Sequence, residues 1–167
     1  MDIAYFRLLF DYNHWANELI LNHCAELTHE QFTEKVPGLS LGSIAGAVGH
    51  QLGTEVIWLS RCRGEAPTRI LSEKDFPSLA AMRERWQKQD ADQAAFLSSL
   101  TDAEVNNVVT YKTMGGGEQK QRLGLMLGHI VNHGMQFRAE AAVGLTAKGK
   151  SPGDIDLIVY LRGQRIV

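Results

Sequence analysis

Apolar side chains recur at helical spacing along four long segments of the chain, and this periodicity most constrains its fold. The first segment runs from Asp2 to about Leu27, and its apolar stripe consists of Ile3, Phe6, Leu9, Phe10, Trp15, Leu19, Ile20 and Cys24. A helix with such a stripe buries it against a neighbour. The other segments run from Ser43 to Arg63, from Leu79 toward Leu100, and from Gln121 to Leu145. Four amphipathic helices predict an all-α four-helix bundle, in a single domain spanning residues 1–167.

Several residues mark where these helices begin and end. Ser78 is a suitable N-cap for the third helix, while Gly64 followed by Pro67 is typical of the end of the second. Thr101 and Glu104 have the spacing of a capping box, which predicts a short extra turn after the third helix. The connection from the third helix to the fourth is therefore longer than a simple turn.

A strand-like pattern precedes the fourth helix. Val109, Tyr111 and Thr113 alternate with other residues, and three glycines follow at 115–117. This pattern favours a short β-hairpin, with a flexible loop as the alternative. A short C-terminal helix is predicted from Asp154 to Leu161.

Composition and charge exclude several classes of partner. The formal net charge of −2 gives no electrostatic reason to expect nucleic acid. Arg61, Arg63 and Arg69 form a local basic group without interleaved aromatic residues, which we interpret as a solvated helix end. No apolar run approaches the roughly 18 residues of a membrane span, and no signal-peptide pattern is visible. Cys24 and Cys62 are isolated and are expected to be buried or semi-buried structural thiols. We therefore expect a cytoplasmic protein.

Two of the six histidines, His129 and His133, lie four residues apart in the apolar run "LGHIVNHGMQF". Four residues is about one helical turn, so both imidazoles project from the same side of the fourth helix. A helix can offer two nitrogen ligands to a metal ion in this way, but such a pair also arises by chance. The pair alone is a weak signal. A metal site would need a third ligand from a facing helix.

His50, on the second helix, is the best candidate for the third nitrogen. Its neighbours on the helix surface are mostly small residues, namely Ser43, Gly46, Ala47, Gly53, Thr54 and Ile57. We therefore expect open space around its side chain. The remaining histidines are assigned other roles. His14 is assigned a structural role beside Trp15, with a place at the mouth of a pocket as the alternative, and His23 and His29 are assigned surface or capping roles.

A line of polar side chains on the fourth helix includes both of its histidines. The members lie within about 60° of one another on a helical wheel: Arg122, His129, His133, Gln136 and Glu140. A polar line at the edge of an apolar face indicates either solvent exposure or a site, and Gln136 and Glu140 are candidate supporting groups. Arg138 falls nearly opposite His129 and is not assigned to this site.

Four segments resemble, in order, motifs of the DinB/YfiT-like family of four-helix bundles. They are "YNHWAN" (Tyr12–Asn17), "GSIAGAVGHQLGTEVIWLSRCRG" (Gly42–Gly64), "GHIVNHGMQFRAE" (Gly128–Glu140) and "PGDIDLIVYLR" (Pro152–Arg162). The resemblance covers nearly the whole chain and implies a three-histidine metal site, carried here onto His50, His129 and His133. The chain departs from the family pattern at Phe137, where many relatives have a later histidine, and at Ala139 and Glu140, which replace Gly-Gln.

The resemblance also implies an activity. Characterised relatives are metal-dependent thiol transferases or isomerases that use a low-molecular-weight thiol and commonly form homodimers. The expected cofactor is a divalent transition metal, Zn or Ni, which activates a small thiol or water toward an electrophilic substrate. The alternative is a non-catalytic, stress-associated bundle that binds a metal or another ligand. Because the formal net charge is −2, neither nucleic acid nor a membrane is an expected partner.

Overall fold

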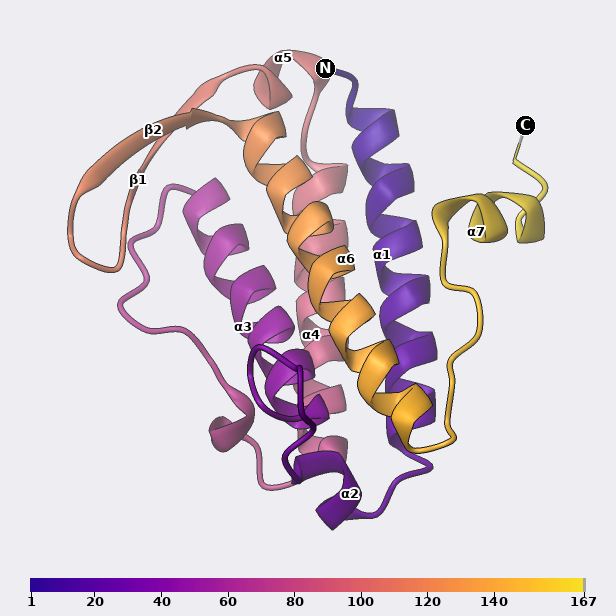
Figure 1. Cartoon of the computed structure of the whole chain (residues 1–167). Coiled ribbons are helices and arrows are strands. Elements are labelled where there is room, and N and C mark those ends of the chain that lie inside the picture. The colour runs from indigo at the N-terminus through magenta and orange to yellow at the C-terminus, as the bar shows by residue number, and fades with distance from the viewer. Residues whose placement is uncertain (167) are drawn as a thin grey trace.

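Four long helices pack side by side in the computed structural model, which describes residues 1–166. They are α1 (Ile3–Cys24), α3 (Ile44–Cys62), α4 (Leu79–Ser98) and α6 (Leu123–Ala147). Their contacts follow the cyclic order α1, α6, α3, α4, so that each helix has two neighbours (Figure 1). The predicted all-α four-helix bundle is confirmed.

The helix directions require one long connection. In Figure 1, α1 and α6 run in one direction, and α3 and α4 run in the opposite one. Because α3 and α4 are parallel, the chain must return along α3 before α4 begins. This return segment, residues 63–78, is called the crossover segment here and contains the 3₁₀ turn η1 (Glu73–Asp75).

Glycines on α3 allow the crossover segment to pack directly on the helix backbone. A Cβ atom added at Gly53 would lie 2.1 Å from the carbonyl oxygen of Leu71, and one added at Gly49 would lie 2.6 Å from the backbone nitrogen of Glu73. No side chain fits at either distance. The expectation of open space beside His50 is therefore wrong on this side of α3, because the crossover segment fills it.

The residues predicted to cap the helices do so. Ser78 caps α4 by accepting a hydrogen bond of 3.2 Å from the first turn, and Gly64 adopts a φ of +78° just beyond the end of α3. Thr101 and Glu104 form a capping box at the start of α5 (Asp102–Val105). The side-chain bonds satisfy N–H groups that a helix start leaves unpaired.

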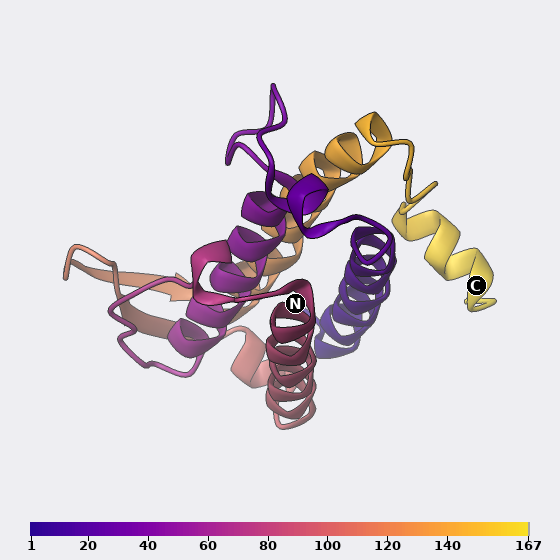
Figure 2. The same cartoon turned by 90° about the horizontal axis from the view of Figure 1, so that it is seen from below.

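Two short helices differ from the prediction. α2 (His29–Thr33) lies in what was predicted as a connection, and it begins with a capping box at Thr28. α7 (Leu157–Gly163) begins three residues later than predicted from Asp154. The Asp154 carboxylate accepts a 3.0 Å hydrogen bond from the backbone N–H of Asp156, and Asp156 itself has an extended backbone, so the helix begins after it. Seen from below, α7 lies outside the four-helix bundle (Figure 2).

Of the two alternatives for the segment before α6, the structure contains the β-hairpin. β1 (Val108–Lys112) pairs with β2 (Glu118–Arg122) in antiparallel register, with Tyr111 opposite Gln119. Gly116 in the turn has a φ of +81°, a conformation that favours glycine. β1 contacts α3 and β2 contacts α6, so the hairpin lies over one end of this helix pair (Figure 1).

The bundle core consists of two separate apolar clusters. One cluster includes Phe6, Phe10, Leu97, Leu127 and Ile130. The other includes Ile20, Leu52, Trp86, Ala141 and Leu145. Cys62 belongs to the first and Cys24 to the second, and burial raises the pKa of both thiols to about 12. Both cysteines are therefore structural, as predicted. Within residues 1–166, no helix has the combination of length and apolar character that spanning a membrane requires.

Candidate functional site

Three histidine rings from two facing helices lie close together between α3 and α6. The ring centroid of His133 is 5.2 Å from that of His50 and 5.6 Å from that of His129. His50 comes from α3, while the other two come from successive turns of α6. All three side chains are half-buried. The structure therefore brings together the three histidines that were singled out as metal ligands.

The spacing of these rings fits a shared metal ion. Two imidazoles on one tetrahedral zinc have ring centroids about 5 Å apart, since each Zn–N bond is about 2.0–2.1 Å long. Nδ1 of His133 is buried and has no hydrogen-bond partner among the described residues, so this nitrogen is free for a ligand. Residues 1–166 nevertheless contain no preformed group of three or more His, Cys, Asp or Glu side chains that could hold a metal. The ring centroids therefore have the spacing of imidazoles that share an ion, whereas the side chains as they stand do not form a metal site.

Burial favours the neutral form of all three imidazoles. Desolvation is the main cause that lowers the pKa of His50 and of His129 below the ordinary 6.5. Desolvation, followed by the charges of the other two rings, lowers the pKa of His133 to about 4. The Glu140 carboxylate opposes the effect at His50, whereas the Arg61 guanidinium adds to it at His129. A neutral imidazole has a free lone pair and is the form that binds metal ions.

Aromatic side chains enclose the histidine cluster at both ends. The ring of Phe137 lies 4.5 Å from that of His50 and 4.6 Å from that of His133. At the other end, the ring of Trp58 packs edge-on against His129 at 4.5 Å. These contacts restrict the orientation of the imidazoles and keep water from one side of each ring.

The rest of the predicted polar line does not join the cluster as a group. The carboxylate of Glu140 accepts hydrogen bonds from the backbone N–H of Ser40, at 2.9 Å, and from its hydroxyl, at 2.7 Å. This interaction fixes the loop that precedes α3. Gln136 and Arg122 are exposed. Of the two supporting candidates on α6, Glu140 is thus committed to a loop contact and also influences His50 electrostatically.

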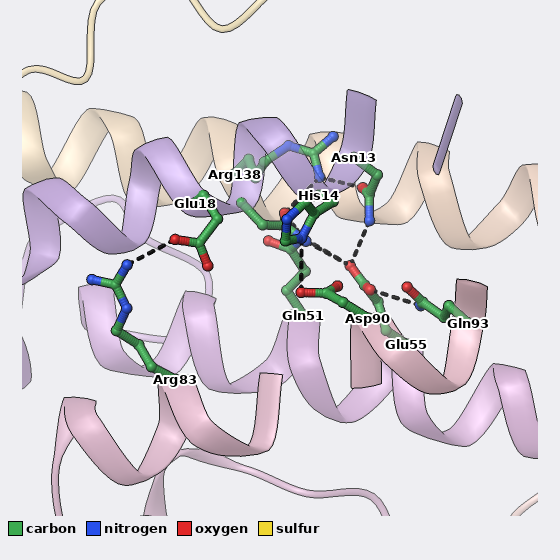
Figure 3. A network of polar contacts seen from close by, with 10 residues as sticks. Asn13, His14, Glu18, Gln51, Glu55, Arg83, Asp90, Gln93 and Arg138 are labelled. Atoms are coloured by element: carbon green, nitrogen blue, oxygen red, sulfur yellow. Dashed lines mark hydrogen bonds and ion pairs between the residues drawn. The ribbon is translucent and has the colours of Figure 1, made fainter. Parts of the chain in front are cut away.

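A second polar cluster, the Glu55 layer, lies inside the bundle between the two apolar clusters (Figure 3). Glu55 is 0% exposed, and Oε1 accepts hydrogen bonds from the amides of Asn13, Asn17 and Gln51 at 3.0, 3.3 and 3.1 Å. Oε2 accepts a hydrogen bond of 2.9 Å from Gln93. Four amide donors surround one buried carboxylate, as a buried charge requires.

Arg138 supplies the cation of the Glu55 layer. It is 0% exposed, and its Nη1 donates to the side-chain oxygens of Asn13 and Asn17, the second bond being 2.9 Å long. Its guanidinium also lies over the ring of Tyr12, 5.4 Å from the centroid. The two asparagines therefore link the buried Arg138 to the buried Glu55, and all four long helices contribute to the layer.

The Glu55 layer was missed by sequence reasoning, although a signal was present. Each of three helices contains two polar residues four positions apart on its buried face. These pairs are Asn13 and Asn17, Gln51 and Glu55, and Gln89 and Gln93. Pairs of this spacing on an otherwise apolar face predict a polar layer in the core. The prediction that Arg138 lies away from His129 is consistent with its position in the layer.

Comparison with known proteins decides the family. The sequence matches the DinB family over residues 2–166. The chain belongs to the DinB family. It is also similar to Protein DinB of Bacillus subtilis (strain 168), with 22% identity over 160 residues that cover 92% of this chain and 91% of that protein. The family predicted from the four sequence motifs is thereby confirmed.

The helix-one motif of this DinB chain contributes to the Glu55 layer. Within Tyr12–Asn17, the amides of Asn13 and Asn17 connect Glu55 to Arg138, and the Tyr12 hydroxyl donates a 3.0 Å hydrogen bond to a backbone carbonyl near α7. The motif therefore holds the bundle together next to the histidine cluster.

The helix-one histidine of this DinB chain belongs to a separate groove. A hollow of about 460 Å³ between α1 and α4 is lined in part by His14 and Asp90 and by none of the three clustered histidines. His14 Nδ1 lies 2.9 Å from a carboxylate oxygen of Asp90. Trp15 instead packs against Tyr160 of α7, with 5.5 Å between the ring centroids. His14 is therefore paired with Asp90 rather than with Trp15.

The basic group at the end of α3 is only partly a solvated helix end. Arg63 and Arg69 are exposed, as predicted. Arg61 is 7% exposed, and its guanidinium lies over the rings of Trp58 and Tyr111, 4.7 and 5.5 Å from the centroids. The prediction was wrong for Arg61, because the aromatic partner on β1 is distant in sequence and was not visible as an interleaved residue.

Proposed function

We propose that this DinB-family protein binds one divalent transition metal ion through His50, His129 and His133. We propose further that it transfers a small thiol to an electrophilic substrate. The observation that supports the site is the spacing of three rings from two helices, all kept neutral by burial. Three imidazoles suit zinc or nickel and leave at least one coordination position open, which is typical of catalytic rather than structural sites.

The metal and the protein would have distinct parts in this reaction. A bound divalent ion supplies positive charge that lowers the pKa of a thiol or of water beside it. The three histidines hold the ion, while Phe137 and Trp58 restrict the rings and limit the access of water. The thiol proton passes to solvent, and the sulfur forms a bond to the electrophilic carbon of the second substrate. The bond from that carbon to its leaving group, the halide of an aryl halide, breaks, and the leaving group departs with the electron pair.

Metal binding is tested first, with the metal-free protein. Zinc or nickel at a free concentration 100 times Kd should stabilise the protein by about 2.7 kcal/mol. For a chain of this size, that free energy corresponds to a rise in Tm of roughly 5–10 °C. His129→Ala and His133→Ala should each abolish most of this rise. His29→Ala, at the exposed start of α2, is the matched control and should leave it unchanged. An unchanged Tm in the unsubstituted protein would refute the site.

Turnover is tested separately on the metal-loaded protein. Glutathione, cysteamine and 3-mercaptopropionate are each combined with an activated aryl halide, and loss of the free thiol is followed with time. We expect metal-dependent turnover that is lost in His133→Ala. Metal binding without turnover of any thiol would reject the transferase and favour the alternative, a metal-binding bundle without catalysis.

A further inference from the structure

Arg61 is a buried cation that lacks an anionic partner. Only 7% of its surface is exposed, and it forms no ion pair with any acidic side chain in residues 1–166. Its Nε is buried and has no hydrogen-bond partner among those residues. Burying a guanidinium is costly unless it is paired and hydrogen-bonded. The fold therefore holds a charge whose natural counterpart is missing from the described chain.

Two aromatic rings hold Arg61 in place. The guanidinium lies over the face of Trp58, from α3, and of Tyr111, from β1, and these two rings are 5.4 Å apart. Such cation–π contacts offset part of the desolvation, but they leave the N–H groups of the guanidinium unpaired. The hairpin that supplies Tyr111 thus orients the cation without neutralising it.

Arg61 lies beside the histidine cluster on the same face of α3. It follows His50 by eleven residues, close to three helical turns, so the two side chains project in similar directions. Trp58, the ring under Arg61, also packs against His129. Trp58 therefore contacts both the guanidinium of Arg61 and the nearest imidazole of the histidine cluster.

We propose that Arg61 is a binding residue for the carboxylate of a small carboxylate-bearing thiol, whose sulfur reaches the histidine cluster. This inference rests on the proposed function, since it names the class of thiol used at that site. A planar guanidinium binds a carboxylate through two parallel N–H···O bonds. A single guanidinium also balances the single charge of a carboxylate. Phosphate carries about 1.5 to 2 negative charges at neutral pH, so part of its charge would remain unbalanced beside a buried guanidinium.

The test compares two thiols that differ in their carboxylate. 3-Mercaptopropionate has both groups, and 2-mercaptoethanol has the thiol alone. On the metal-loaded protein, 3-mercaptopropionate should bind more tightly by roughly tenfold or more, the effect of one charge-assisted hydrogen bond. Arg61→Met should abolish this preference, so that 3-mercaptopropionate and 2-mercaptoethanol bind with equal affinity. Arg61→Lys should retain part of it, because the charge remains but the planar fork is lost.

Arg63→Met is the matched control, because Arg63 is a neighbouring exposed arginine whose Nη2 donates to the carbonyl of Asp92 on α4. It should retain the full preference for the carboxylate-bearing thiol. Circular dichroism and Tm identify any variant that fails to fold. If Arg61→Met does not fold, the preference for 3-mercaptopropionate over 2-mercaptoethanol is compared between Arg61→Lys and the unsubstituted protein. An equal affinity for the two thiols in the unsubstituted protein, or a preference that survives Arg61→Met, would overturn the proposal.

A second measurement separates this proposal from the metal site. Propionate is added to the metal-free protein, and the fluorescence of Trp58 is followed, with Trp58→Phe used to assign the signal. We expect a saturable change that Arg61→Met abolishes and Arg63→Met retains, whether or not the protein binds metal. Inorganic phosphate should act more weakly than propionate. A response to phosphate that equals or exceeds the response to propionate would overturn the assignment to carboxylates.

Discussion

His14 and Asp90 form a pair whose contribution to stability depends on pH. The hydrogen bond that His14 donates to the Asp90 carboxylate is the largest cause that raises the pKa of His14 above 6.5. Burial is the largest cause that raises the pKa of Asp90 above 3.8. The His14 side chain is 52% exposed, so solvent screens the pair, and its contribution stays below about 1 kcal/mol.

The pH dependence of this pair can be predicted in sign. The folded protein holds the His14 proton more tightly than the unfolded chain, so the pair's contribution is fully present below pH 6.5. It is lost as the pH rises through the raised pKa of the folded state. Urea unfolding at a series of pH values should show that His14→Gln lowers the free energy of unfolding most below pH 6.5. The loss should become progressively smaller above that pH.

A control makes the measurement at His14 specific. His29→Gln, at an exposed position at the start of α2, should leave the pH dependence of stability unchanged. If the cost of His14→Gln is the same at every pH, the ion pair with Asp90 does not contribute and only packing of the ring matters.

Sequence reasoning at the scale of residues was successful where the signal was local. Ser78 and Gly64 act at the ends of their helices as predicted, because capping depends on neighbours within one turn. The prediction was wrong for Arg61, since its burial depends on Tyr111, fifty residues further along the chain.

At the scale of elements, the contact between α3 and the crossover segment is decided by glycine. Gly53→Ala would place a Cβ atom 2.1 Å from the carbonyl oxygen of Leu71, so the crossover segment would have to move. Overpacking of this kind costs about 1–3 kcal/mol. We expect a loss of that size in the free energy of unfolding, together with faster amide hydrogen exchange in residues 64–78.

Gly128→Ala is the matched control on another helix. The nearest atom to an added Cβ at Gly128 is Cε1 of Phe6, at 4.0 Å, an ordinary van der Waals distance. The substitution should therefore stabilise α6 by up to about 1 kcal/mol through helix propensity alone. If both substitutions stabilise the protein, the contact at Gly53 does not constrain the crossover segment.

At the scale of the whole molecule, the Glu55 layer connects all four long helices. Glu55 and Arg138 are both 0% exposed, and they are linked through Asn13 and Asn17. Removing either charged partner alone leaves buried groups unpaired, at a cost of about 3–5 kcal/mol. Glu55→Ala and Arg138→Ala should each destabilise the protein by about this amount.

The double variant of Glu55→Ala and Arg138→Ala should lose less free energy of unfolding than the sum of the two single losses. The difference should be about 0.5–3 kcal/mol, because the two residues share one network. Glu18 and Arg83 provide a matched control, since this pair joins α1 to α4 at 2.8 Å but is partly exposed (Figure 3). Glu18→Ala and Arg83→Ala should each lower the free energy of unfolding by only about 0–1 kcal/mol. Urea unfolding measures each free energy. Strict additivity for Glu55 and Arg138 would show that the layer does not act as a unit.

The sequence by itself determined the four long helices, where most of them end, and that His129 and His133 share one face of α6, although it did not predict the short helix α2. These features depend on contacts within a few residues, and the 3.6-residue period records them directly. The resemblance to family motifs additionally pointed to His50. The order of the four motifs was sufficient to predict the DinB family.

Only the tertiary structure decided which side chains meet across helices. The ring contact between His50 and His133, the Glu55 layer and the enclosure of Arg61 by the hairpin each join residues more than thirty positions apart. Such contacts depend on helix direction, rotation and crossing. The crossover segment allows α3 to run parallel to α4, and side-chain packing between the helices sets the rest. Periodicity reports the face on which a side chain lies, but it does not encode the partner that this face will contact.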